Sequence, residues 1–206
     1  MEMSKSVYGY IGDAWNRPLD DDTKELYRQR LIEWRRGPSF QRVERPLRLD
    51  KARMLGYKAK PGYIIVRAKV RKGSFRKRAI NKGRRAKRKG ETRLKVRKNT
   101  QRIAEERTQK RHPNMEVLNS YPIGEDGKQK YFEVILVDPH HPVIMKDPKI
   151  NWIQGRQHTR RVYRGLTSAG KKSRGLRKKG KGSEKSRPSR AAHEHKKRPG
   201  KKVRIP

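Results

Sequence analysis

The residues most able to do chemistry in this sequence are cations, gathered between Arg71 and Lys98. This stretch holds 15 Lys and Arg residues against one acid, Glu91, and three glycines interrupt it. Guanidinium groups fork onto phosphate oxygens, and lysines attract them as point charges. Without a counter-charge, so many cations in so short a segment repel one another. The stretch therefore favours binding to a polyanion over a solvated protein surface.

A second motif, GLTSAGKKS at residues 165–173, nearly spells a nucleotide-binding P-loop. Gly165 and Gly170 have the required spacing and Lys171 follows them. However, Lys172 stands where a magnesium-binding hydroxyl belongs, because Ser173 comes one place late. The preceding HTRRVYR is also a poor buried strand. We therefore interpret the motif as a glycine-rich loop that faces RNA phosphates with backbone N–H groups and lysines, not as a hydrolytic site.

The other candidates for metal or catalytic chemistry are weak. Asp20, Asp21 and Asp22 precede a predicted helix, where carboxylates stabilise the positive N-terminus, so a helix cap explains them better than a Mg²⁺ site. No nucleophile elbow is present. None of the histidines has a spacing that closes a metal site; they are His112, His140, His141, His158, His193 and His195. The sequence predicts neither a metal centre nor an enzyme.

The composition limits how much of the chain can form a core. The chain has 206 residues, a net charge of +39 and 31% hydrophobic residues, enough for one small core with long basic extensions. The absence of cysteine excludes disulfides and thiolate chemistry. The N-terminus lacks the pattern of a signal peptide, and the apolar runs are far shorter than the roughly 20 residues that span a bilayer. We therefore expect an intracellular protein without a membrane span.

The charge is segregated along the chain. Residues 41–112 carry a net +23 and residues 154–206 a net +18, whereas residues 1–40 are neutral and residues 113–153 carry a net −2. This alternation predicts a folded part built from the neutral blocks, with the basic blocks threaded along phosphates.

Two helices are predicted in residues 1–40. The first has an apolar stripe at i, i+4, i+8 spacing and ends before Pro18. The second begins near Asp22 with a pattern like a capping box and also has one apolar stripe. Because such a stripe must be buried, Trp15 and Trp34 are expected in the core.

Strand signals follow. Residues 62–71, GYIIVRAKVR, alternate as a strand with one apolar face and one basic face. A helix is predicted from about Thr100 to Arg111, capped by Asn99 or Thr100. The turn GEDG at residues 124–127 then predicts a hairpin, whose second strand has apolar residues on both faces and is expected to be central and covered on both sides.

These elements predict one body over residues 1–153, with a basic internal loop at about 72–92, followed by a basic, glycine-rich C-terminal extension over residues 154–206. The extension has too few large apolar residues to form a core alone. Without RNA, we expect residues 72–92 and 177–206 to be mobile, and a short helix at residues 189–198 to require a partner that neutralises its charge.

Three functions compete at this stage. A structural RNA-binding protein suits basic residues in irregular, glycine-punctuated loops. A DNA-compacting, chromatin-type protein is the second alternative, because such a charge holds any duplex, but no helix-turn-helix, heptad or zinc finger supports it. An RNA-modifying enzyme is the third, and it would need a cofactor loop or clustered catalytic acids, which do not stand out.

Three long stretches resemble one family of ribosomal proteins. They are RPLRLDKARMLGYKAKPGYIIVRAKVRKG at residues 45–73, AEERTQKRHPNMEVLNSYPIGEDGKQKYFEVILVDPHHPVIMKDPKINWI at 104–153, and RGLTSAGKKSRGL at 164–176. The family is the archaeal and eukaryotic type of large-subunit ribosomal protein fifteen, the fifteen-e family. The acidic run Asp20–Asp22 makes the chain look like an archaeal version.

The resemblance implies an α+β fold: a small, mostly antiparallel sheet with packed helices, long basic extensions and a C-terminal tail. It implies a structural role in the cytoplasmic ribosome that supports translation, with large-subunit rRNA and neighbouring large-subunit ribosomal proteins as partners. It implies no membrane, no small-molecule substrate and no cofactor, although structural Mg²⁺ bound to the rRNA is compatible with it.

Basic stretches and resemblance together predict a set of RNA-binding residues. They are Arg45, Arg48, Lys51, Arg53, Tyr57, Lys58, Lys60, Arg67, Lys69, Arg71, Lys72, Arg76, Arg78, Arg84, Arg85, Arg164, Lys171, Lys172, Arg174 and Arg177. The aromatic residues among basic neighbours, Tyr57, Phe75 and Tyr163, could stack on bases or equally form the edge of the core.

Overall fold

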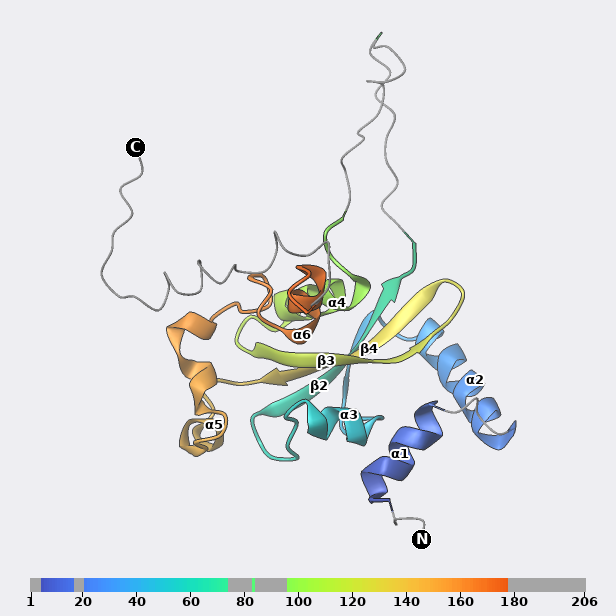
Figure 1. Cartoon of the computed structure of the whole chain (residues 1–206), viewed down its shortest axis with the longest axis horizontal. Coiled ribbons are helices and arrows are strands. Elements are labelled where there is room, and N and C mark those ends of the chain that lie inside the picture. Colours follow the sequence, from blue (N-terminus) through green and yellow to red (C-terminus); the bar gives the residue numbers. More distant parts are fainter. Residues whose placement is uncertain (1–4, 17–20, 74–82, 84–95, 178–206) are drawn as a thin grey trace.

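A four-stranded antiparallel sheet forms the centre of the protein in the computed structural model, which describes residues 5–16, 21–73, 83 and 96–177 (Figure 1). The strands lie in the order β1-β2-β4-β3. Their bounds are Phe40–Val43 for β1, Tyr63–Arg71 for β2, Glu116–Glu125 for β3 and Gln129–Val137 for β4. The predicted α+β class is confirmed.

Helices cover both faces of this sheet. One face packs against α2 (Asp21–Arg36), α3 (Leu49–Met54), α5 (Pro142–Lys146) and the 3₁₀ helix η2 (Asn151–Gln154). The helix α1 (Val7–Asn16) lies against α3. The other face packs against α4 (Thr100–Arg111) and α6 (Ser168–Ser173), which lie together in Figure 1. Two apolar clusters result, one on each face of the sheet.

The strand β4 is central, as predicted, with β2 and β3 on its two sides. Every residue from 131 to 137 is buried. Tyr131, Ile135 and Val137 belong to one apolar cluster and Phe132, Val134 and Leu136 to the other. A strand covered on both faces needs apolar side chains at successive positions, and this signal made β4 predictable.

The strand β2 differs from its prediction. Its expected basic face begins with Tyr63 and Ile65, which are buried among the residues of α3 and α5, and only Arg67, Lys69 and Arg71 carry charge there. The strand is therefore covered on both faces in its first half, and its cations are confined to the second half.

Local signals explain two further elements. Asn99 caps α4, as one of the two predicted alternatives, because its Oδ1 accepts from the Arg102 N–H at 2.8 Å. The predicted GEDG turn is also present, and Asp126 Oδ1 accepts from the backbone N–H groups of Lys128 at 2.7 Å and Gln129 at 2.6 Å. These bonds fix the β3–β4 hairpin.

The residues after 153 pack on the body as far as residue 177. Val162 is fully buried against α4 and the sheet, although the 3₁₀ helix η3 (Arg156–His158) and the turns around it contribute few apolar groups. Residues 178–206, which include the predicted helix at 189–198, and most of 72–92 lie outside the described part of the chain.

The tryptophans have different environments. Trp34 is 3% exposed and packs against Tyr131, as predicted for a core residue. Trp15 is only half-buried. Within the described residues, none of the helices combines the length and apolar character that a membrane crossing requires.

Candidate nucleic-acid interface

A cleft of about 700 Å³ lies between the end of β2, the β3–β4 turn and α4. We call it the cationic cleft. Five cations and no acid line it among the described residues; its lining is Ser39, Lys69, Arg71, Lys72, Gly73, Arg107, Gly127, Lys128 and Gln129. A cleft walled by one sign of charge focuses its field, so this one attracts anions.

Two of the five cations are used to hold the fold. Lys69 Nζ donates to the backbone carbonyls of Trp34 at 3.5 Å, Arg35 at 3.0 Å and Gly37 at 2.6 Å. These carbonyls belong to the end of α2, where they lack helical partners and carry partial negative charge. Lys72 Nζ donates to the Asp126 carbonyl at 2.9 Å. These predicted RNA-binding lysines therefore have structural contacts within the protein.

The other three cations are free to meet a ligand. Arg71, Arg107 and Lys128 are exposed and form no ion pair within the described residues. Sequence reasoning singled out Arg71 but missed Arg107 and Lys128, because a helix and a hairpin turn bring them to β2 from distant positions. The hairpin turn was a usable signal for Lys128, since its tip must be exposed.

Other predicted residues of the β2 region are paired. Arg67 stacks over the Trp34 ring at 5.1 Å and donates to Gln41 at 2.5 Å. Lys58 and Lys60 both reach Asp147, at 2.9 and 2.5 Å, and these two ammonium groups hold the pKa of the Asp147 carboxyl far below its usual range. A pair of lysines that shares one carboxylate presents less net charge than the sequence suggests.

The basic residues around α3 are mixed in exposure. Arg45 and Arg53 are exposed and Lys51 is half-buried, whereas Arg48 is 9% exposed and pairs with Asp50 at 3.3 Å. Arg48 Nε has no hydrogen-bond partner among the described residues.

The C-terminal segment is attached by a buried carboxylate. Glu105 on α4 is fully buried and accepts from Ser120 Oγ at 2.5 Å and from Thr167 Oγ1 at 2.6 Å. Burial raises the pKa of Glu105, although the two hydroxyl groups and the nearby Arg161 and Arg102 oppose the rise. We call Glu105, Ser120 and Thr167 the Glu105 cluster. It joins α4, β3 and the segment before α6.

The near P-loop is a short helix, which differs from the predicted loop. Thr167 caps α6 by accepting from the Gly170 N–H at 3.1 Å, so that donor does not face a ligand. A Cβ on Gly170 would lie 2.6 Å from the Cα of Gly165, so glycine permits close backbone packing there. No strand precedes the motif, since residues 159–165 form turns. Lys171 and Lys172 remain exposed.

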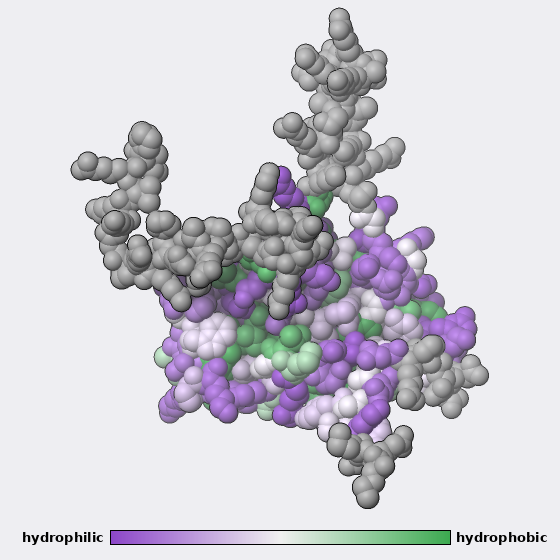
Figure 2. Space-filling model, viewed as in Figure 1, coloured by the Kyte–Doolittle hydropathy of each residue, from purple (hydrophilic) through white to green (hydrophobic). Residues whose placement is uncertain are grey.

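The remaining predicted cations of this segment lie on the surface. Arg164, Arg174 and Arg177 are exposed; Arg164 donates to the backbone carbonyls of Gln157 and Thr159, and Arg174 to that of Arg164 at 3.4 Å. Arg76, Arg78, Arg84 and Arg85 lie outside the described residues. Figure 2 shows that hydrophilic residues cover most of the visible coloured face, with apolar residues near its middle and in smaller patches elsewhere.

The aromatic residues divide between core and surface. Tyr57 is 8% exposed and packs edge-on against Tyr63 with 6.0 Å between ring centroids, so it lies in the core. Tyr163 is 37% exposed and its hydroxyl donates to the Glu106 carbonyl at 3.2 Å. Phe75 lies outside the described residues. No group of three or more histidines and acids that could hold a metal ion occurs in the described ranges.

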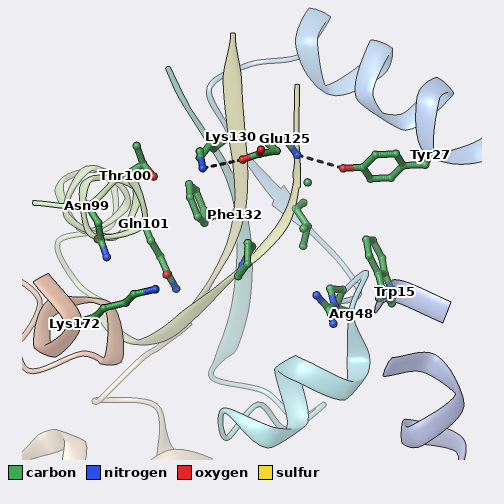
Figure 3. A pocket seen from close by; sticks show the side chains of 13 residues that line it. Trp15, Tyr27, Arg48, Asn99, Thr100, Gln101, Glu125, Lys130, Phe132 and Lys172 are labelled. Carbon is green, nitrogen blue, oxygen red and sulfur yellow. Dashed lines mark hydrogen bonds and ion pairs between the residues drawn. The ribbon is translucent and has the colours of Figure 1, made fainter. Parts of the chain in front are cut away.

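A second hollow has two predicted RNA-binding residues in its lining, on opposite sides of a strand. It has a volume of about 720 Å³, and Arg48 and Lys172, far apart in the sequence, both line it (Figure 3). Trp15, Tyr27 and Gln101 also line it, and sequence reasoning did not connect them with a site. We call it the β3-edge pocket because it extends around Pro122–Glu125 of that edge strand.

The sheet, its helices and the unpaired surface cations define a class: a basic α+β protein suited to a polyanionic partner. The Ribosomal L15 family matches residues 6–193 of the chain. The chain is 56% identical over 187 residues to the large ribosomal subunit protein eL15 of Haloarcula marismortui. The aligned residues make up 91% of this chain and 95% of that relative. The chain is 55% identical to the protein of the same name from Methanospirillum hungatei, with the same coverage. The chain belongs to the Ribosomal L15 family, and the resemblance noted in its sequence is confirmed.

Proposed function

We propose that this protein is a structural, non-enzymatic constituent of the large ribosomal subunit. It binds and stabilises large-subunit rRNA through its basic loops and tail, and thereby supports translation. Family membership supports this role, since both relatives named above are large-subunit proteins.

The observation that carries the RNA contact is the cationic cleft. Arg71, Arg107 and Lys128 converge there without ion pairs in the described residues, while Lys69 and Lys72 add charge behind them. A backbone phosphate that enters the cleft meets five cations and no described acid. Arginine forks are suited to hold it in a fixed orientation.

The partners follow from the same role. Large-subunit rRNA is the principal partner, neighbouring large-subunit proteins are the others, and the place of action is the cytoplasmic ribosome. Mg²⁺ associates with such an assembly through the RNA phosphates, so the protein needs no cofactor of its own. We assign the RNA-binding role first to the exposed, unpaired cations and last to Lys58, Lys60 and Lys69, which have partners within the protein.

The experiment compares two variants with the same change in charge. Arg71, Arg107 and Lys128 are changed together to Gln, and Lys24, Arg28 and Arg36 on the exposed side of α2 are changed together as the control. Binding of the full chain to large-subunit rRNA is measured over a range of salt. Each lost phosphate contact should make the slope of log K against log salt shallower by roughly 0.7 to 0.9.

We expect a slope shallower by about two to three for the cleft variant and a smaller change for the control. Equal changes would show a diffuse field without a phosphate site in the cleft. The proposal would be overturned by two results together: duplex DNA competes for the protein as well as rRNA does, and the protein does not co-sediment with the large subunit in high salt. These results would favour the DNA-compacting alternative.

A further inference from the structure

The β3-edge pocket has aromatic walls from separate elements. Trp15 comes from α1, Tyr27 from α2 and Phe132 from β4, and the first two lie on one side of the β3 strand in Figure 3. Arg48 stacks over the Trp15 ring at 5.0 Å. Its volume of about 720 Å³ lies in the range of small-molecule sites, roughly 300 to 1,000 Å³. Phe132 is only 4% exposed, whereas Trp15 and Tyr27 are partly buried, and their faces beside a cavity of this size suit a flat ring system.

Polar residues of α4 and α6 lie on the opposite side of the strand from Trp15 and Tyr27, on the same side as Phe132. Asn99, Thr100 and Gln101, from the start of α4, lie there with Lys172 of α6 (Figure 3). Gln101 Nε2 donates to the Ser120 carbonyl and hydroxyl oxygens, both at 2.9 Å, so its side-chain carbonyl remains available as an acceptor. These amides can recognise the edge of a heterocyclic ring, which carries both donors and acceptors.

The charge of the lining favours an anionic ligand. Its cations are Arg48, Lys130 and Lys172, and its acid is Glu125. Lys130 at 2.8 Å and Lys72 at 3.3 Å neutralise Glu125 and lower the pKa of its carboxyl. Lys172 is exposed and forms no ion pair in the described ranges. A phosphate attached to a ring in the pocket can therefore reach a free cation.

The strand that crosses the pocket is closed to a peptide. Arg161 Nη1 donates to the carbonyls of Val117 at 2.8 Å and Leu118 at 2.6 Å, and Gln101 occupies that of Ser120. The Glu125 N–H donates to Tyr27 Oη at 3.3 Å. Pro122 has no N–H to offer. The edge of β3 therefore lacks the run of free backbone groups that an added strand needs.

We propose that the β3-edge pocket receives an unstacked base of the bound RNA, with Trp15 as its principal stacking surface. The inference rests on the proposed function and adds a recognition mode to it, since the cationic cleft contacts phosphate and the pocket contacts a base. RNA-binding proteins commonly stack extruded bases on aromatic side chains, and such stacking tolerates any base because every base has a flat face.

The first test uses a synthetic RNA hairpin with one bulged 2-aminopurine and the same hairpin with an abasic site in its place. The full chain should bind the abasic RNA about 10-fold more weakly, and 2-aminopurine fluorescence should change on binding. In a Trp15→Leu variant, which keeps an apolar side chain but loses the aromatic face, the two RNAs should bind nearly equally. The control is Tyr10→Leu, since Tyr10 is a 60% exposed aromatic residue of α1 that does not line the pocket.

The salt dependence separates this inference from the proposed function. Stacking releases no counterions, so Trp15→Leu should leave the salt slope unchanged while the cleft variant makes it shallower. If the natural protein binds neither the hairpin RNAs nor rRNA, the proposed function is contradicted. A protein that binds with the normal salt slope but does not distinguish the base from the abasic site contradicts the pocket alone.

The second test uses large-subunit rRNA itself. Chemical probing of unpaired bases should show at least one base that the natural protein protects, that Trp15→Leu leaves reactive and that Tyr10→Leu still protects. Identical protection by all three proteins would overturn the inference. So would a Trp15→Leu variant that binds rRNA normally but no longer binds a neighbouring large-subunit protein, because the pocket would then receive a protein segment.

Discussion

The central sheet and the C-terminal segment at residues 154–177 are held in different ways. Successive apolar residues of β4 enter two apolar clusters, whereas the segment contributes Val162 to one cluster and otherwise relies on directed hydrogen bonds. Thr167 bonds to Glu105, Arg161 to two carbonyls of β3, and the Arg160 N–H to Glu116 at 2.7 Å. A chain with so many cations thus reserves its few apolar residues for the sheet and attaches its basic part through polar groups.

The largest expected effect comes from a charged substitution in the core of the central sheet. Leu136 is fully buried at the centre of β4, so Leu136→Asp places an unpaired carboxylate in the core. We expect a loss of about 3 to 5 kcal/mol in the free energy of unfolding. Urea unfolding followed by circular dichroism measures it, and Leu136→Met is the matched control. An unchanged transition would place β4 away from the core.

A smaller effect is expected from a substitution that detaches the C-terminal segment at residues 154–177 from α4. Glu105→Leu leaves the hydroxyls of Ser120 and Thr167 without their acceptor, so we expect a loss of about 1 to 3 kcal/mol. Hydrogen exchange should increase in residues 160–177 while the β4 amides stay protected. Glu105→Gln retains an acceptor and should cost less. Equal exchange in the two regions would show that segment and sheet open together.

The next prediction separates RNA binding from stability. Changing Lys171, Lys172 and Arg174 together to Gln should leave the melting temperature nearly unchanged, because these side chains are exposed and their charges make no ion pair in the described residues. The salt slope of rRNA binding should become shallower by about two to three if all three contact phosphate. A folded variant with an unaltered slope would show that α6 does not contact phosphate. If the natural protein hydrolysed ATP and the same variant did not, the P-loop interpretation would be restored.

The smallest expected effect concerns the hairpin turn in acid. Although desolvation opposes ionisation, hydrogen bonds from the Gln129 and Lys128 N–H groups, Tyr131 and Arg35 lower the pKa of Asp126 from 3.8 to about 2. Because the folded pKa is the lower one, its stabilising contribution is complete above pH 4 and is lost as the pH falls towards 2. Asp126→Asn should remove this part of the pH dependence, which unfolding curves at stepped pH would detect as a difference from the natural protein.

Much of the fold could be predicted because its signals are local. The cap at Asn99, the GEDG turn and the double-sided apolar pattern of β4 each act within a few residues of the chain. The sequence did not predict β1 or α3, which are short and have weak periodicity. It also did not predict how the segment after residue 153 attaches, because a buried pair such as Glu105 and Thr167 joins residues 62 positions apart without a repeating pattern.

The candidate site was harder to predict for a related reason. The sequence shows which residues are cations, but the partner that uses each charge comes from elsewhere, as Asp147 does for Lys58 and Lys60 across 89 and 87 positions. By its sequence pattern Lys69 is an ordinary strand lysine, yet its ammonium group donates to backbone carbonyls at the end of α2. Arg107 and Lys128 become site residues only when α4 and the hairpin meet β2.

The closed edge of β3 matters most before the protein meets RNA. An open edge strand is a template on which a second copy can add a strand, and a chain that waits for its nucleic acid is exposed to that reaction. Arg161, Gln101, Tyr27 and Pro122 occupy or remove the groups that would start it, and the net charge of +39 keeps copies apart. Tyr27, Gln101 and Pro122 also line the β3-edge pocket, so we expect residues of the pocket to protect the newly made chain from aggregation as well.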